Sequence, residues 1–116
     1  MSQHRKLKRC AFLTLDERGG WFIDDELAVK PLAQLGCEVS TVSWRQTEEP
    51  WSAFDAVIIR STWDYWDHTN AFLTVLEEIN ASTRLANSLP LVHWNLAKSY
   101  LRDMEEQGVG IVPSLW

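Results

Sequence analysis

Short apolar runs alternate with amphipathic segments along the chain, and each pattern predicts a different kind of element. Two mostly apolar runs, Cys10–Leu15 and Ala56–Ile59, are typical of strands that are covered on both faces of a parallel sheet. The segment Glu38–Trp44 is rich in valine and threonine, and it predicts another strand between them, which is the second along the chain. Shorter extended pieces are expected within Leu89–Trp94 and over residues 111–113.

A first helix is predicted over Asp24–Leu35. Asp24 or Asp25 can cap its start, and Gly36 stands where a glycine commonly ends a helix. Pro31 lies inside this segment, and it is expected to kink the helix or to delay its regular part.

Two further helices follow from apolar residues at i, i+3, i+4 and i+7 spacing. The clearer stripe can be capped by Asp67 or Thr69 and consists of Phe72, Val75, Leu76 and Ile79. The second stripe ends before Gly108 and consists of Ala97, Tyr100, Leu101 and Met104.

The order of elements predicts an α/β domain with a mainly parallel sheet of four to five strands and helices on both faces. It reads β-α-β-β-α-β-α-β, or β-α-β-α-β-α-β if residues 45–55 contain a crossover helix. We expect the first strand to lie between the second and the third.

Length and charge narrow the class of protein. A chain of 116 residues suits one core, so we expect a single domain over residues 10–116 after a basic lead-in at residues 1–9. The net charge of −5 argues against a nucleic-acid partner, and the apolar runs are too short for a membrane span or a signal peptide. Cys10 and Cys37 are too few for a disulfide framework or a zinc site. Buried free thiols in a cytoplasmic protein are expected instead.

The most reactive residue types gather after the first and third strands. The loop Asp16–Trp21 reads DERGGW, and the third strand runs into RSTWDYWDH at residues 60–68. Ligands of open α/β sheets bind outside the carboxyl ends of the strands, where the strand order reverses. The two loops therefore predict a binding site at that edge.

Each candidate in the second loop has a functional and a structural interpretation. Arg60 can grip a carboxylate or a phosphate through its planar fork, or it can pair with Asp64 to hold the loop. Ser61 and Thr62 can donate to a ligand, or they can bond to nearby backbone. Asp64 and Asp67 can act as bases or bind a metal, although Asp67 suits a helix cap better.

The aromatic and histidine residues also have both a functional and a structural interpretation. Trp63, Tyr65 and Trp66 can line a pocket, but at least one of them is expected to shield the edge of the sheet. His68 is expected to be exposed, and His93 to be a core histidine. Gly19 and Gly20 lack the spacing of a nucleotide-binding motif, so no such motif is predicted from the residues alone.

Several spaced motifs resemble a group of ATP-grasp proteins that includes glutathione synthetase, RimK-type ligases and the ligase of cycloserine biosynthesis. The likeness covers residues 10–116, with proline more usual in the family at the position of Gly110. The segments that carry it are Trp51–Asp55, Val57–Tyr65, Val92–Leu101 and Gly108–Pro113.

The resemblance implies a Rossmann-like, three-layer pre-ATP-grasp domain that contributes part of a substrate site. Such enzymes use ATP and Mg²⁺ to convert a carboxylate into an acyl phosphate, which an amine then attacks. The resemblance assigns Lys98, in the N-x-x-K segment, to the ATP phosphates, where a solvated helix lysine is the alternative. It assigns substrate contacts to Arg60, Ser61, Thr62, Trp63, Asp64 and Tyr65.

The catalytic ATP-grasp domains are expected beyond Trp116, so no catalytic or metal-binding residue is assigned in this chain and no activity is expected of it alone. A non-catalytic binding or interaction module that kept the fold is the alternative. Trp94 and Trp116 lie where a following domain would pack, so exposed apolar surface and a homodimer are also expected.

Overall fold

The computed structural model describes residues 7–16, 23–96 and 100–113. It divides the chain into two compact units, Met1–Ala86 and Asn87–Trp116. The first unit holds the sheet, and every residue that is buried among those described belongs to it. The second unit holds two helices, α3 (Leu89–Leu96) and α4 (Tyr100–Glu106).

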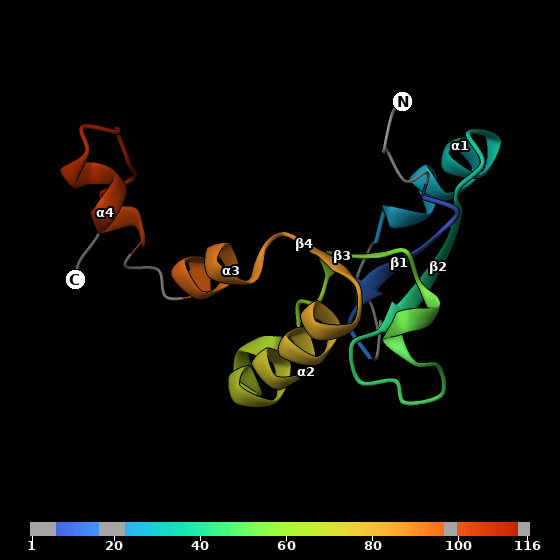
Figure 1. Ribbon diagram of the computed structural model, residues 1–116. Coiled ribbons are helices and arrows are strands. Elements are labelled where there is room, and N and C mark those ends of the chain that lie inside the picture. Colours follow the sequence, from blue (N-terminus) through green and yellow to red (C-terminus); the bar gives the residue numbers. More distant parts are fainter. Residues whose placement is uncertain (1–6, 17–22, 97–99, 114–116) are drawn as a thin grey trace, which may run out of the picture. The chain divides into compact units, whose positions relative to one another are not determined.

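The sheet of the first unit has four parallel strands in the order β2-β1-β3-β4 (Figure 1). Its strands are β1 (Arg9–Thr14), β2 (Glu38–Ser43), β3 (Ala56–Ser61) and β4 (Arg84–Ala86). The prediction that the first strand lies between the second and third is confirmed, as is the mainly parallel α/β fold. The carboxyl ends of β1, β2 and β3 therefore lie at one edge of the sheet.

Alternation along the strands gives the sheet two covered faces. On one face, Cys10, Phe12 and Val39 pack against Ala28 and Leu32, which belong to the 3₁₀ helix η1 (Asp25–Ala28) and to α1 (Val29–Gln34). On the other face, the long helix α2 (Thr69–Ser82) buries Phe72, Leu76 and Ile79. Phe72 meets the Trp44 ring edge-on, with ring centroids 5.3 Å apart.

The helix ends explain where the chain turns back. Gly36 follows α1 with a φ of 91°, and its N–H donates to the Ala33 carbonyl while Cys37 N–H donates to the Leu32 carbonyl. These paired bonds satisfy two terminal carbonyls of α1 and require the left-handed backbone that glycine adopts easily. Pro31 lies in the first turn of α1, where its missing N–H costs little, so the regular part of the helix begins late, as predicted.

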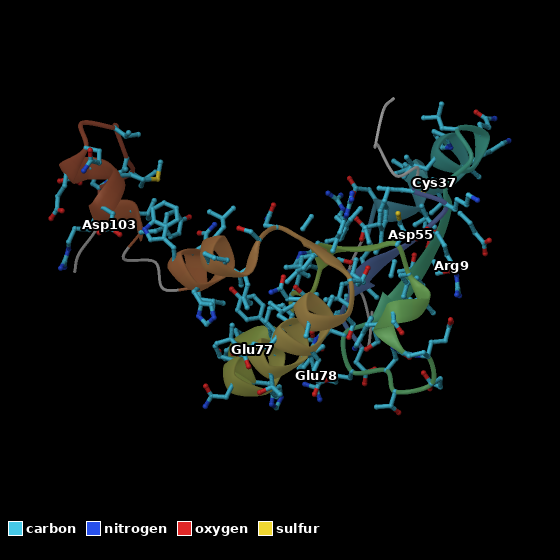
Figure 2. All side chains as sticks on the ribbon, viewed as in Figure 1. Arg9, Cys37, Asp55, Glu77, Glu78 and Asp103 are labelled. Atoms are coloured by element: carbon cyan, nitrogen blue, oxygen red, sulfur yellow. The ribbon has the colours of Figure 1, made fainter. Side chains whose placement is uncertain are left out.

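At the amino end of the sheet, Asp55 fixes the start of β1. Its Oδ2 accepts the backbone N–H groups of Lys8 and Arg9, each at 3.0 Å, and Figure 2 shows Asp55 beside Arg9. In the same region the Sγ atoms of Cys10 and Cys37 are 3.3 Å apart, and both cysteines are buried and free, as predicted.

Three sequence predictions in the connections are wrong. Leu89–Trp94 lies in the helix α3, and the fourth strand is instead Arg84–Ala86. An apolar run this short has no periodicity that separates a strand from a helix, and the Ser88 carbonyl accepts the Val92 N–H to start the helix. The suggested crossover helix at residues 45–55 is only the 3₁₀ turn η2 (Trp51–Ala53). Residues 111–113 form no strand.

The predicted helix caps also need correction. His68 holds the cap position of α2 without a side-chain bond, and Asp67 lies in the 3₁₀ turn η3 (Tyr65–Asp67). Asp24 holds the cap position of η1, again without a side-chain bond, while Asp25 turns inward and is buried. Among the described residues, no helix has both the length and the apolar character that crossing a bilayer requires.

Candidate functional site

Asp64 joins the carboxyl ends of three strands. Its Oδ1 accepts the indole N–H of Trp44, which follows β2, at 2.8 Å. Its Oδ2 accepts the backbone N–H of Asp16, which follows β1, at 3.3 Å. Asp64 itself follows β3, so this carboxylate joins Asp16, the first residue of one predicted loop, to the other predicted loop.

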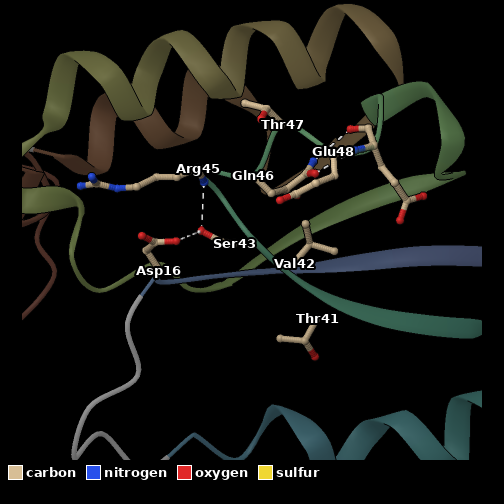
Figure 3. Close-up of a pocket in the computed structure, with 9 residues that line it drawn as sticks. Asp16, Thr41, Val42, Ser43, Arg45, Gln46, Thr47 and Glu48 are labelled. Atoms are coloured by element: carbon tan, nitrogen blue, oxygen red, sulfur yellow. Dashed lines mark hydrogen bonds between the residues drawn. The ribbon is translucent and has the colours of Figure 1, made fainter.

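A second carboxylate extends the network towards β2 (Figure 3). Asp16 Oδ1 accepts the Ser43 hydroxyl at 3.0 Å, and Ser43 Oγ accepts the backbone N–H of Arg45 at 3.1 Å. The Arg45 guanidinium lies 4.5 Å from the centroid of the Trp44 ring, which is a cation–π contact.

Two crevices open around these residues. One, of about 390 Å³, lies across the ends of the three strands and is lined by Leu15, Asp16, Arg45, Asp64, Trp66, Asp67 and His68. The other, of about 460 Å³, runs along β2 and the loop after it and is lined by Asp16, Thr41–Ser43 and Arg45–Glu49 (Figure 3). We call the first of these the strand-end crevice.

The charges of the strand-end crevice decide which ligands suit it. Three carboxylates face one guanidinium, so the lining favours a cationic group such as an ammonium over an anion. A nucleotide triphosphate does not fit this donor set, because the acidic side chains would repel its phosphates. Within the described ranges, no three His, Cys, Asp or Glu side chains are grouped as metal ligands.

Arg60 forms its ion pair with a different carboxylate from the one that the sequence suggested. Its Nε donates to Oδ1 of Asp25 at 3.0 Å, so the carboxylate that it pairs with is Asp25 rather than Asp64. The other oxygen of Asp25 accepts the Ser61 hydroxyl at 2.8 Å. Ser61 Oγ is in turn 2.7 Å from Thr14 Oγ1, which makes a network of four side chains in which Asp25, Ser61 and Thr14 are buried and Arg60 is exposed.

The aromatic residues of the loop differ in how far they are packed against the fold or exposed to solvent. Tyr65 stacks on Phe72 of α2 with ring centroids 5.0 Å apart. Trp66 is 71% exposed at the rim of the strand-end crevice. Trp63 is 41% exposed, whereas Thr62 is buried and its carbonyl accepts the Tyr65 N–H.

The structure separates the predicted site residues. Asp64 lines the strand-end crevice, Arg60 and Ser61 belong to the Asp25 network on the α1 face, and Thr62, Trp63 and Tyr65 belong to neither. His68 is exposed and lines the crevice, and His93 is exposed on α3 rather than part of a core. Lys98 and residues 17–22 lie outside the described residues.

Sequence reasoning missed Asp25 and Arg45. The sequence pattern indicates Asp25 only as a helix cap, although its place after the loop of the first strand also makes it a candidate partner for Arg60. Arg45 comes directly after the second strand, so the rule that indicated the other two loops would also have indicated it.

These features define a parallel α/β domain with a polar crevice at the carboxyl ends of its strands. The family model described as "D-cycloserine synthetase DcsG, N-terminal domain" matches residues 10–87. The chain belongs to this family of cycloserine-synthetase-like ligase domains.

Individual relatives agree with this family. Over 80 residues the chain is 35% identical to the cycloserine biosynthesis protein DcsG of Streptomyces lavendulae, a match that covers 69% of this chain and 27% of the relative. The crystal structure of D-cycloserine synthetase DcsG superimposes with a TM-score of 0.79 at 30% identity, covering 90% of this chain and 35% of that one. The chain therefore spans well under half the length of the relatives it matches.

Proposed function

We propose that this chain is the substrate-side N-terminal domain of an ATP-dependent carboxylate–amine ligase of the ATP-grasp class. The observation that carries the proposal is the coincidence of a cycloserine-synthetase N-terminal fold with a polar crevice at the carboxyl ends of its strands. In such a ligase a carboxylate takes a phosphoryl group from ATP, and an amine then displaces phosphate from the acyl carbon to form an amide. Both chemical steps would depend on domains outside this chain.

The residues of this chain would bind and orient substrate. The acidic strand-end crevice suits the ammonium or amine end of a small molecule, and Trp66 at its rim can restrict access of water to that end. Arg60, on the α1 face of the same strand end, suits a carboxylate. This division supports a substrate that carries both an amine and a carboxylate.

The first test is the DNA sequence downstream of codon 116. We expect it to encode a glycine-rich lid and the acidic magnesium ligands of an ATP-grasp domain. The protein from the complete gene should then release ADP only when a carboxylate and an amine substrate are both present. A downstream sequence with no ATP-binding domain would overturn the ligase proposal and favour the binding module.

A variant of the crevice tests the substrate role. In the protein from the complete gene, Asp67→Asn should raise the KM for the amine substrate, because it removes one charge that lines the crevice. Glu77→Gln is the matched control, since Glu77 is an exposed acid on α2 outside the crevice (Figure 2). Equal KM values for the two variants would count against the crevice as the amine site.

The 116-residue chain by itself should show no ATP-dependent ligation and very weak nucleotide binding. A single lysine–phosphate pair in water contributes at most about 1 kcal/mol, so Lys98 alone cannot hold a nucleotide. Robust ATP hydrolysis by this chain that disappears in Lys98→Ala would contradict the proposed division between domains.

A further inference from the structure

We propose that Asp25 is a positioning residue that holds the Arg60 guanidinium in place for a substrate carboxylate. The inference rests on the proposed function, because it takes Arg60 to be the carboxylate-binding group. It goes beyond that function because it assigns a role to Asp25, a buried acid far from Arg60 in the sequence. It also assigns a role to a β-bulge that directs the Arg60 side chain towards Asp25.

The first observation is a β-bulge at Arg60. Along β1 and β3 the residue pairs run in step as far as Leu13 with Ile59, but the next pair is Thr14 with Ser61. Arg60 is therefore the extra residue of β3, opposite no residue of β1. Bulges of this kind redirect side chains and are common beside functional sites.

The bulge changes which face Ser61 occupies. Strict alternation would place Ser61 on the α2 face with Ile59, because neighbouring residues of a strand point to opposite faces. With one residue inserted, Ser61 instead shares the α1 face with Thr14, and the two hydroxyl oxygens are 2.7 Å apart. Arg60 and Ser61, although consecutive, can thus both reach Asp25.

The second observation is that both carboxylate oxygens of Asp25 accept a hydrogen bond on this face. Asp25 is 3% exposed, and each of its oxygens accepts one of the two bonds, from Arg60 Nε and from Ser61 Oγ. The single Ser61 hydroxyl hydrogen goes to Asp25, so Thr14 must be the donor in the Thr14–Ser61 bond. The hydroxyl of Thr14 thus donates to Ser61, and the hydroxyl of Ser61 donates to Asp25. These bonds hold the plane of the Asp25 carboxylate.

The third observation concerns the part of Arg60 that remains for a ligand. The bond to Asp25 uses Nε, so the two terminal amino groups stay outside it, and the side chain is 47% exposed. Its Cζ also lies 5.9 Å from the centroid of the Phe12 ring. A guanidinium held at Nε and backed by a ring has few orientations left, and its outer edge matches the two oxygens of a carboxylate.

Acetate binding to the 116-residue chain tests the proposal without ATP or any other domain. In ¹⁵N-detected spectra of the arginine side chains, the Arg60 Nε–H signal of the wild type should shift in a saturable way with sodium acetate and not with sodium chloride. Asp25→Asn should weaken this binding at least tenfold, whereas Asp24→Asn, the exposed neighbouring acid, should leave it unchanged. The backbone amide spectra of β1 and β3 report whether each variant is folded.

The outcomes separate the inference from the proposed function. No saturable shift in the wild type would mean that Arg60 is not a carboxylate site, and both ideas would fail at this residue. Acetate binding that is equal in folded Asp25→Asn would overturn the positioning role alone and leave Asp25 as a structural partner. If Asp25→Asn does not fold, Ser61→Ala removes one of the two bonds to Asp25 and should still weaken acetate binding several-fold; unchanged binding there would refute the proposal.

Discussion

At the residue scale, Asp64 shows how one side chain both shapes the crevice and holds it together. Trp44 is 2% exposed, and its indole N–H is donated to Asp64, so this bond satisfies a polar group that cannot reach water. The same carboxylate also accepts the backbone N–H of Asp16, which follows β1.

Replacing Asp64 with alanine is expected to destabilise the fold. The buried Trp44 N–H would lose its acceptor, which costs about 1–3 kcal/mol in the free energy of unfolding. Asp64→Asn keeps one side-chain oxygen and should recover most of that loss. Urea unfolding of the three proteins measures the difference, and an Asp64→Ala variant as stable as the wild type would show that the bond is not structural.

Cys10 predicts how stability depends on alkaline pH. Burial, followed by the hydrogen bond with Cys37 and the charges of Cys37 and Asp55, raises the pKa of the Cys10 thiol to about 12. In the unfolded chain the thiol ionises near its ordinary pKa of about 8.5, so the unfolded state loses the proton first as pH rises. Stability should be complete below about pH 8.5 and fall above it, approaching about 1.4 kcal/mol per pH unit, until the folded thiol also ionises.

Removing this thiol should remove that dependence. Between pH 8 and 10.5, the free energy of unfolding of Cys10→Ala should fall less steeply than that of the wild type, although the variant is less stable at neutral pH because it leaves a small cavity. Parallel curves for the two proteins would contradict the raised pKa.

At the element scale, two helices end in the same way. After α4, Gly108 has a φ of 87°, its N–H donates to the Glu105 carbonyl, and Val109 N–H donates to the Met104 carbonyl. Gly36 and Cys37 donate the equivalent pair of bonds after α1. Both glycines were expected from the sequence, because an apolar stripe that stops before a glycine is a local signal.

Gly36→Ala should therefore cost about 1–2 kcal/mol of stability, since a Cβ is disfavoured in the left-handed region. Gly36→Asn should cost less, because asparagine tolerates this backbone. Gly110→Ala is a control without positive φ, and no atom lies within 4 Å of the added Cβ. Thermal unfolding compares the three, and equal melting temperatures for Gly36→Ala and Gly110→Ala would refute the strain argument.

At the scale of the whole molecule, the buried residues among those described all lie in the first unit. None of the described residues in 87–113 is buried, and Leu91, Trp94, Val109 and Val112 are exposed apolar residues there. In this unit Trp94 packs on Tyr100 and its indole N–H donates to Asp103, but no described core covers these contacts. The family model also ends at residue 87.

Hydrogen exchange should show this difference directly. Amides of β1 and β3 are expected to exchange only through global unfolding, whereas those of α3 and α4 should exchange by local opening, orders of magnitude faster. Mass spectrometry of peptides from the two units measures both rates. If the amides of α3 and β1 are equally protected from exchange, the prediction is wrong, and the second unit is more stable than its lack of described buried residues indicates.

The sequence by itself determined the strands β1 to β3 and the place of β1 between β2 and β3. It also determined the glycines that end α1 and α4, and the gathering of polar residues at the carboxyl ends of the strands. These features depend on local patterns, such as apolar runs and terminating glycines, that act over a few residues. Only the tertiary structure decided that Asp25 rather than Asp64 pairs with Arg60, that a bulge places Ser61 beside Thr14, and that Arg45 joins the crevice. Each of these depends on the register between strands and on partners 20 or more residues apart, which no local pattern specifies.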